Sequence, residues 1–346
     1  CHAITQTVSS QNTIGVMLSH KKNLMEEPSL TADHTPAQAP LIFQWGIFPI
    51  VMGLSVLCSW WLMAGGMAPP LAILGPQFAA FAIVATFEHV YPYHVSWNKS
   101  RSDVSVDARH AVGIGILIVV ITPPMIAIGV AMGGWLSDRF GVGLWPTEWP
   151  LLAQIALVLI VGELPGYWVH RWEHEKQALW RFHAVHHSAP RLYWLNAGRF
   201  HPIDSLLTFA PAYLLLVILG CGEVMLAYFG MIAAVHGIFQ HANVQLRLGP
   251  LNWIFSMAEL HRWHHSKTIV EANHNYGQTI SIWDWVFGTR FLPADRSPPE
   301  EIGIADLPAF PMTWWGQILS PFRWRQIKEA SMTQSAVPES ADPVSD

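Results

Sequence analysis

Long apolar runs, separated by short polar or Gly- and Pro-containing segments, organise the chain between residues 41 and 238. A helix needs about 20 apolar residues to cross the roughly 30 Å hydrocarbon core of a bilayer. Four runs meet this length and two later ones are shorter. The pattern predicts an all-α integral membrane protein with four transmembrane helices, and six membrane segments if the short pair also enters the bilayer. The long runs are Leu41–Ala64, Leu71–Val90, Ala111–Gly133 and Pro150–Val169, and the short ones are Leu206–Leu219 and Glu223–Ile238.

The two ends of the chain are more polar than these runs. Residues 1–40 contain no apolar stretch of the signal-peptide type, so we predict a mostly disordered N-terminal arm. Residues 292–346 form a C-terminal tail. Its last part, from Glu329 to Asp346, is polar enough that we predict disorder there as well.

Composition strengthens the membrane assignment. Hydrophobic residues make up 51% of the chain and charged residues only 12%, whereas about 25% of residues are charged in soluble proteins. The 18 tryptophans fit the same picture, because Trp is enriched at the membrane–water interface. The net charge of −5 gives no indication of nucleic-acid binding. The three cysteines are too scattered to form a disulfide framework or a thiolate metal site.

The distribution of Lys and Arg predicts the orientation, because cytoplasmic loops are enriched in these residues. Suppose that the N-terminus is cytoplasmic and that both hairpins of long spans return to that side. Arg139 is then the only one of the 19 Lys and Arg residues in an outer loop. This arrangement predicts both termini in the cytoplasm, together with a helical cap formed by the histidine-rich segments that follow residue 169.

Three histidine clusters stand out after the fourth run. Their spacings of three and four residues put the side chains on one face of a helix, one turn apart. Imidazole is a common ligand of iron, zinc and copper, and eight imidazoles are enough to hold more than one metal ion. The clusters are His170 and His174; His183, His186 and His187; and His261, His264 and His265.

Other interpretations of the clusters fit less well. A single histidine on an apolar helix face is usually a core residue, but three clusters at ligand spacing favour a metal site. The HExxH pattern of zinc proteases is excluded, because Arg171 follows His170. Glu175 does follow His174, but Ala178 stands where the second histidine of that pattern is needed.

These patterns, with further motifs in the same order, resemble the histidine boxes of the fatty acid hydroxylase/sterol desaturase superfamily. The resemblance covers about Ala153 to Phe291. It divides the chain into transmembrane helices at 41–152, a catalytic domain at 153–291 and the tail at 292–346. The accompanying motifs are Arg199-Phe200-His201-Pro202, Asn275-Tyr276-Gly277, and Trp283-Asp284 ahead of Phe287-Gly288-Thr289.

The resemblance implies a membrane enzyme in which histidines alone hold two iron ions. Such an enzyme uses O2 and two external electrons to hydroxylate or desaturate an unactivated C–H bond of a lipid, such as a sterol or a fatty acyl chain, and we favour hydroxylation. Zinc can replace iron in purified material, because an all-imidazole site suits both metals. The implied ligands are His170, His174, His183, His186, His187, His236, His241, His261, His264 and His265, of which His241 matches the family better than His236.

Four further residues are candidates to hydrogen-bond the ligands and orient them, and no catalytic residue beyond the ligands is implied. Glu163 is an ionisable residue in an apolar run, so it either orients an imidazole or lies at the membrane interface. His201 either plays the same role or caps a helix. Asn275 and Asp284 belong to the motifs that accompany the histidines.

The chain has no flavin or haem motif, so its electrons must come from a partner such as a cytochrome b5-like protein or a ferredoxin, with its reductase. The basic residues Arg171, Lys176, Arg181 and Arg191 are candidates to dock an acidic partner. Two other functions use the same histidines: a zinc-dependent membrane hydrolase, and a non-enzymatic carrier of metal or haem. Metal analysis combined with O2 consumption separates the oxygenase from the hydrolase.

Overall fold

The computed structural model describes residues 37–140 and 144–336. The disorder predicted for residues 1–36 and 337–346 falls outside these ranges. Within them the chain is helical, with three isolated β-bridges and no strand, as predicted.

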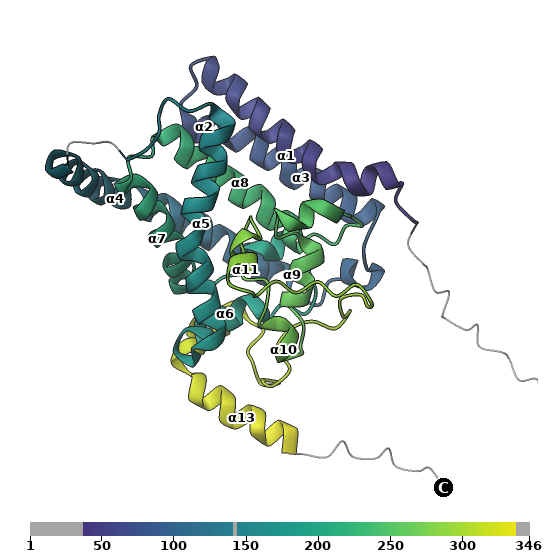
Figure 1. Ribbon diagram of the computed structural model, residues 1–346. Coiled ribbons are helices and arrows are strands. Elements are labelled where there is room, and N and C mark those ends of the chain that lie inside the picture. The colour runs from purple at the N-terminus through teal and green to yellow at the C-terminus, as the bar shows by residue number, and fades with distance from the viewer. Residues whose placement is uncertain (1–36, 141–143, 337–346) are drawn as a thin grey trace, which may run out of the picture. The chain divides into compact units, whose positions relative to one another are not determined.

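Five helical segments of the described chain are long and apolar enough to cross a membrane (Figure 1). The four long runs predicted from the sequence are all helical, and α8 is long enough to be a fifth span. Helix α7 (Pro202–Ile218) is shorter than a span. The five segments are α1 (Leu41–Ala64); α2 (Pro69–Ala72) with α3 (Leu74–Val90); α4 (Val104–Phe140); α5 (Leu151–Glu175); and α8 (Glu223–His241).

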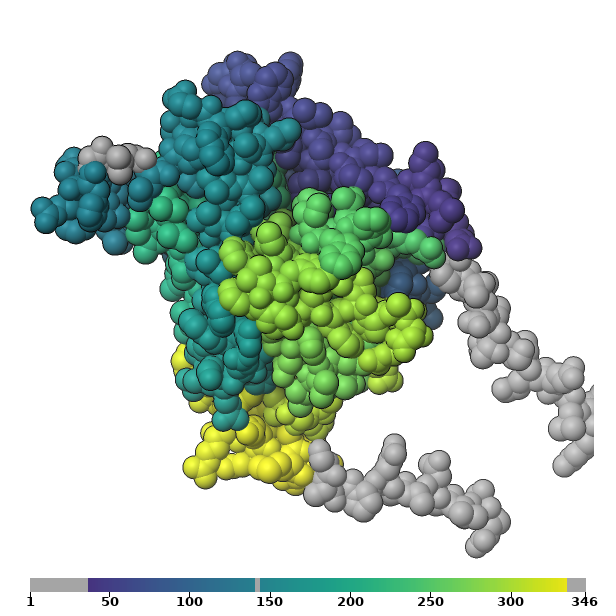
Figure 2. Space-filling view, viewed as in Figure 1, coloured from purple at the N-terminus to yellow at the C-terminus, as the bar shows by residue number. Residues whose placement is uncertain are grey.

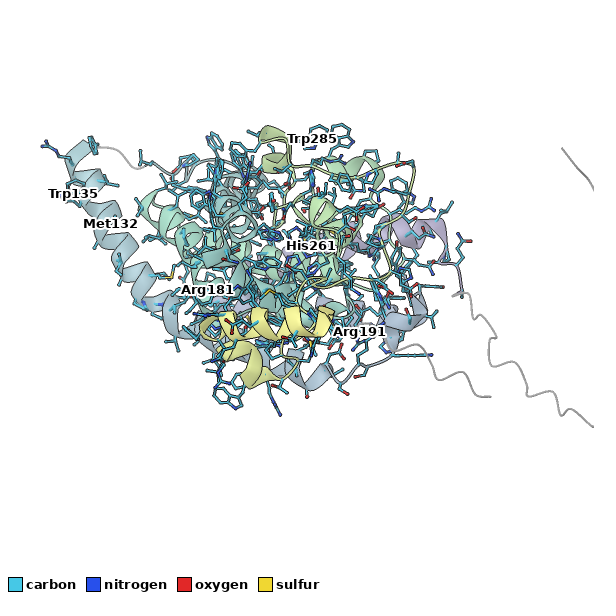
Figure 3. All side chains as sticks on the ribbon, turned by 90° about the horizontal axis from the view of Figure 1, so that it is seen from below. Met132, Trp135, Arg181, Arg191, His261 and Trp285 are labelled. Atoms are coloured by element: carbon cyan, nitrogen blue, oxygen red, sulfur yellow. The ribbon has the colours of Figure 1, made fainter. Side chains whose placement is uncertain are left out.

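Helix α4 is much longer than its apolar run predicts. It has 37 residues and continues through both Pro123 and Pro124, which gives a length of about 56 Å at 1.5 Å per residue. Its C-terminal half carries Met132 and Trp135, whose side chains are exposed and lie away from the rest of the bundle (Figure 3).

Two glycines of α4 let α7 pack closely against it. A Cβ on Gly129 would lie 2.6 Å from the Val217 side chain, and one on Gly133 would lie 3.0 Å from the Ile218 carbonyl oxygen. Small residues four apart allow such close helix contacts in membranes. The contact brings the end of α7 to the connection between α4 and α5, where Trp145 lies 3.8 Å from the Cβ position of Gly220. Helix α7 therefore returns the chain to the end of the bundle at which α4 ends.

Helix α8 is the centre of the bundle. In the 18-residue apolar stretch of α8, 72% of the residues are buried within the protein, whereas the corresponding share for α4 is 6%. Residues Met231, Val235 and Phe239 are fully buried in the main core cluster, which also takes residues from α1, α3, α5 and α7. A helix that is apolar on all sides belongs in such a position. Its last residue, His241, is thereby carried to the end of the bundle where the other histidine clusters lie.

The histidine-bearing segments lie together below the bundle in the view of Figure 1. Helix α5 ends at Glu175, and the extended backbone of Lys176 separates it from α6 (Gln177–His187). The third cluster lies on the short helix α9 (Ala258–His264) and on the residue after it. Helices α10 (Ile269–Ala272) and α11 (Ile282–Val286) belong to the loops that follow.

The C-terminal segment, yellow in Figure 2, is more ordered than predicted. It contains α12 (Trp314–Leu319) and α13 (Trp324–Ala336). The prediction of disorder from Glu329 onward is therefore wrong up to residue 336. The reason is a small second core, in which Ile327 of α13 is buried with Phe310 and with Ala184 and Val185 of α6.

Candidate metal centre

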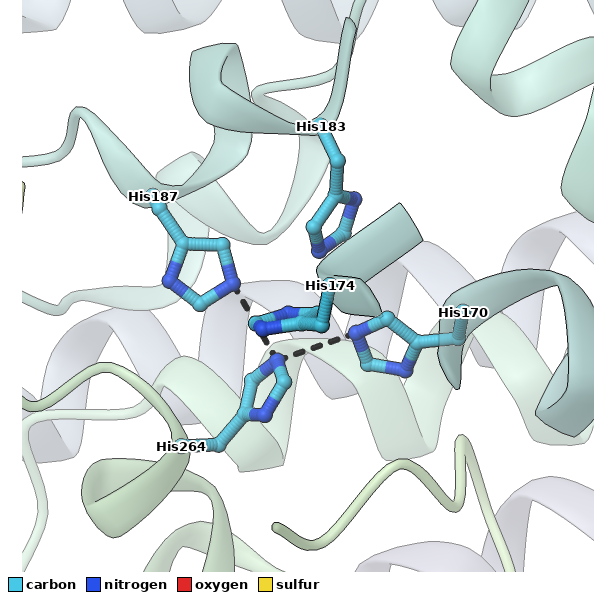
Figure 4. A group of neighbouring side chains, drawn as sticks. All are labelled: His170, His174, His183, His187 and His264. Carbon is cyan, nitrogen blue, oxygen red and sulfur yellow. Dashed lines mark hydrogen bonds between the residues drawn. The ribbon is translucent and has the colours of Figure 1, made fainter. Parts of the chain in front are cut away.

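Helices α5, α6 and α9 bring five histidines to one point (Figure 4). The Nε2 atom of His264 lies 2.9 Å from that of His170 and 3.2 Å from that of His187. Ligand atoms about 2.0–2.1 Å from a shared metal ion lie at separations of this size. The group consists of His170, His174, His183, His187 and His264, each with a ring nitrogen within 4.8 Å of the others.

A second group of four histidines lies beside the first. The Nε2 atom of His265 lies 3.1 Å from that of His186 and 3.0 Å from that of His261, which in turn lies 3.0 Å from that of His241. Each HxxHH cluster is thus divided between the two groups. His183 and His187 face the first group and His186 the second, while His264 faces the first and His261 and His265 the second.

Hydrogen bonds at the opposite ring nitrogen fix the tautomer of several histidines. The Nδ1 atom of His170 donates to the Tyr276 carbonyl oxygen at 2.8 Å, and that of His264 donates to the His274 carbonyl oxygen at 2.8 Å. Because these acceptors carry no proton, both Nε2 atoms present lone pairs to each other at 2.9 Å. The Nε2 atoms of His174 and His183 are buried and have no hydrogen-bond partner. Converging lone pairs of this kind are what metal ions need, so the residues fit two metal sites.

Burial favours the neutral imidazole at five of these positions on α6 and α9 and at the residue after α9. It lowers the pKa of His264 well below the ordinary value of 6.5, and the neighbouring histidines lower this pKa further. A histidine must be neutral to bind a metal ion, so the buried rings are ready for this role at physiological pH. Burial lowers the pKa in the same direction for His186, His187, His261 and His265.

Two buried carboxylates lie next to His183, and the sequence motifs do not predict this role for them. Asp204 and Glu173 approach His183 Nδ1 with oxygens at 3.3 Å and 3.5 Å. Both carboxylates are almost fully buried. A carboxylate at this position fixes the tautomer of a ligand imidazole and makes it a stronger ligand. The signal was faint, since Glu173 lies between His170 and His174 and Asp204 follows the Arg-Phe-His-Pro motif.

Asparagine side chains fix the tautomer of two other histidine rings. Asn196 accepts from His241 Nδ1 at 2.8 Å, and Asn273 accepts from His174 Nδ1 at 3.2 Å. Neither asparagine belongs to a motif identified in the sequence. Both lie far along the chain from the histidine they contact, so only the folded structure reveals the pairs.

Asp284 and Asn275 act on the histidines through the backbone. Asp284 accepts from the amides of Tyr276 and Gly277 at 2.8 Å each, and the Tyr276 carbonyl is the acceptor for His170. Asn275 has a positive φ of 57°, and its side chain donates to the Leu260 carbonyl oxygen at 3.0 Å. Neither side chain has a hydrogen bond to an imidazole. Together they fix the loop that carries the acceptors of the ligand rings.

Glu163 does not orient an imidazole, which corrects one of the two predicted roles. Its carboxylate accepts from the amides of Thr279 and Ile280 at 2.9–3.0 Å and is 2% exposed. This contact ties the loop after Asn275-Tyr276-Gly277 to the middle of α5. Glu163 is buried in the protein, so it is not an interface residue either.

His236 and His201 lie outside both groups. His236 is fully buried, and its ring packs edge-on against Phe48 and lies near Phe255. It stands five residues before His241 on α8, which turns it to a different face of the helix. His201 caps α7, where it accepts from the Ile203 amide at 3.1 Å. The structure thus brings together nine of the ten predicted ligands and leaves out His236.

The basic residues proposed to dock a partner differ in exposure. Arg191 is 3% exposed and forms an ion pair with Asp103 at 2.6 Å, so it is not available to a partner. Lys176 is exposed and Arg181 is partly exposed, and Arg171 pairs with Glu175.

A cavity of about 340 Å³ opens onto both histidine groups. Most of its apolar lining comes from α3, α4, α7 and α8 and from the turn Trp194–Gly198, and α5, α6 and α9 close the end at the histidines. Apolar cavities with a few convergent polar groups are typical small-molecule sites. The histidines that line it are His170, His183, His186, His241 and His261.

Comparison with known proteins agrees with this site. The fatty acid hydroxylase family model matches residues 155–289. The ornithine lipid hydroxylase OlsE of Rhizobium tropici is 38% identical over 252 residues, which cover 72% of this chain and 75% of that protein. Methylsterol monooxygenase 1 of Gallus gallus is 29% identical over 165 residues, or 45% of this chain and 53% of that protein. Alkylglycerol monooxygenase of Danio rerio is 30% identical over 165 residues, or 47% of this chain and 35% of that protein. No solved structure matches the chain significantly.

Proposed function

The chain belongs to the fatty acid hydroxylase/sterol desaturase superfamily, and from this premise we propose that it hydroxylates a membrane lipid at a histidine-bound di-iron centre. The observation that carries the proposal is the division of nine histidines into two adjacent groups at one apolar cavity. The similar proteins are lipid hydroxylases and monooxygenases, so the enzyme is an oxidoreductase that acts on lipid C–H bonds.

Iron is the metal that the proposed chemistry requires. Zinc fits the same imidazoles, but Zn(II) has no redox chemistry and cannot activate O2. Bound iron supplies O2 activation. The overall reaction converts R–H, O2, two electrons and two protons into R–OH and water.

The protein's own residues hold this site in position and keep it dry. The carbonyl groups of Tyr276 and His274 and the carboxylate of Asp204 fix the imidazoles at Nδ1, so that Nε2 points inward. The apolar walls of the cavity exclude water and bind the hydrocarbon part of the lipid. Because the groups are already held in place, less entropy is lost when the substrate reaches the reactive geometry.

The most extensive similarity among these relatives supports a polar acyl lipid as substrate. The ornithine lipid hydroxylase shares 38% identity over 75% of its length, whereas the methylsterol monooxygenase is matched over 53% of its length. We therefore favour a lipid of the ornithine-lipid type over a sterol, and hydroxylation over desaturation.

The electrons come from a separate donor of the cytochrome b5 or ferredoxin class. The exposed Lys176 lies between the histidine-bearing helices α5 and α6, and the partly exposed Arg181 lies on α6. They are the basic residues best placed to attract an acidic donor. Replacing both by Glu should slow reduction by such a donor and leave metal content unchanged.

The metal centre lies on the cytoplasmic side in this proposal. Helix α7 returns the chain to the outer end without being long enough for a full span, and α8 brings it back, so the six helical segments alternate in direction. Both termini and all histidine groups then share the side that carries nearly all Lys and Arg residues.

The direct test is lipid analysis of a host with and without the gene, with the purified enzyme assayed for O2 consumption and metal content. A new hydroxylated lipid that depends on iron and O2 is the expected result. An O2-independent hydrolysis product in a zinc-loaded enzyme would contradict the proposal.

A further inference from the structure

The position of His170 along α5 indicates how deep the candidate metal centre lies relative to the lipid bilayer. Helix α5 places His170 19 residues after Leu151, or about 28 Å at 1.5 Å per residue. This equals nearly the whole hydrocarbon core of about 30 Å. The histidines therefore lie at the level of the lipid head groups on their side of the membrane.

The cavity leads from this level into the hydrocarbon region. On α8 its lining runs from His241 back to Phe229, a length of about 18 Å. Half of the hydrocarbon core measures about 15 Å, so the cavity is about as deep as one leaflet. Gly237 adds width beside the histidines, because no atom lies within 4 Å of its Cβ position.

The polarity of the lining changes along this length. Near the histidines it includes Gln240, Gln278 and the carboxylate of Glu173. Glu173 is 1% exposed, and one of its carboxylate oxygens lies 3.5 Å from His183 Nδ1. A few polar groups in an otherwise apolar cavity typically orient the ligand, so this end suits the polar part of a lipid. Farther from the histidines the lining is mostly apolar, with Phe81, Ile121, Met125, Phe209 and Phe229, and its polar members there include Gln77, Thr122 and Tyr213.

The cavity opens sideways through the surface of α4. Gly115 and Ile118 line the cavity, yet both belong to the exposed surface, where Ile118 is 40% exposed. This stretch of α4 is strongly apolar and lies within a membrane span. The opening therefore faces the hydrocarbon of the bilayer.

We propose that the lipid enters sideways past Gly115 with its polar head directed to Glu173 and the histidines, and that its acyl chain remains in the apolar end of the cavity. The oxidised C–H bond then belongs to the head group or to the carbons beside it, and not to the methyl end of the chain. The inference rests on the proposed function and adds the orientation and position of attack. A lipid bound in this way keeps its place in the leaflet, so no extraction from the membrane is needed.

Tandem mass spectrometry of the host lipids tests the position of attack. The expected result is that the new oxygen stays with the fragment that contains the head group and the carbons next to it. An oxygen in the methyl half of an acyl chain would overturn the inference while the proposed function stands. If no lipid is oxidised, the proposed function fails and the inference fails with it.

Two glycine variants of α4 test the route of entry. No atom lies within 4 Å of the Cβ position of either Gly115 or Gly113, but only Gly115 lines the cavity. Gly115→Leu should fill the opening and reduce lipid turnover on the order of tenfold or more, with wild-type metal content. Gly113→Leu, two residues away, is the matched control and should keep wild-type turnover. Equal turnover in the two variants would refute entry past Gly115.

Discussion

At the scale of single residues, the proposed metal centre depends on which nitrogen of each imidazole carries the proton. Backbone carbonyls and side-chain oxygens accept a hydrogen bond from Nδ1 of six histidines, which leaves the Nε2 atoms of these rings available for the two proposed metal ions. Replacing a ligand histidine should therefore lower the metal affinity more than replacing a residue that supplies one of these oxygens. The six are His170, His174, His183, His186, His241 and His264.

His264→Ala should remove metal and abolish turnover. The variant loses an Nε2 atom close to those of both His170 and His187, so the first group can no longer hold its ion. The loss of affinity should exceed the roughly 10–100-fold typical of losing a residue that only orients a ligand. Metal content and product yield are measured together. His89→Ala is the control, because His89 is exposed and bonds only the Ala85 carbonyl oxygen.

His236→Ala should keep the full metal content, although the sequence suggested a ligand. The ring packs against Phe48 and lies outside both groups. Its removal should lower stability by about 1–3 kcal/mol, as for other buried truncations. The measurement is the metal content of the folded variant. Loss of one ion per chain would show that His236 is a ligand.

At the scale of helices and loops, a few contacts set the position of the site. Glu163 in the middle of α5 holds the amides of Thr279 and Ile280, and Asp284 holds those of Tyr276 and Gly277. The loop after α9 is therefore fixed to a membrane helix. On the other side of the cavity, α4 and α7 are held together by the glycine contacts described above.

Gly129→Val should destabilise the bundle. The new side chain would collide with Val217, which lies 2.6 Å from the Cβ position. Overpacking of this kind costs about 1–3 kcal/mol, so the thermal unfolding temperature in detergent should fall. Gly134→Val is the matched control on the same helix, because no atom lies within 4 Å of its Cβ position. Equal unfolding temperatures for the two variants would argue against the α4–α7 contact.

At the scale of the whole molecule, the sequence predicts the helices and all nine histidines of the candidate metal centre, with His236 as one residue too many. Eight of the nine depend on local spacing, whereas His241 comes from the family resemblance. Apolar runs of 20 residues and histidines three or four apart are visible without the fold. The pairing of His183 with Asp204, or of His241 with Asn196, joins segments that only packing brings together. The ordered part of α13 was missed for a similar reason, since Ile327 finds its core only against α6 and its neighbours.

Cysteine labelling from the two sides of the membrane should confirm the orientation. In a background without native cysteines, Ser137→Cys should react only from outside and Gln177→Cys only from the cytoplasm. Both residues are exposed and lie near opposite ends of the spans. The expectation follows from the Lys and Arg distribution. Reaction of both positions from one side would overturn the proposed topology.

The central claim is that nine histidines hold two iron ions that oxidise a lipid. The most direct measurement is the metal content of one active preparation, by elemental analysis and Mössbauer spectroscopy, with lipid turnover followed in the same sample. We predict about two iron ions per chain, as the two histidine groups require, and turnover that falls in proportion when iron is removed by a chelator. Full turnover with one metal ion per chain, or with zinc as the only metal, would contradict the account.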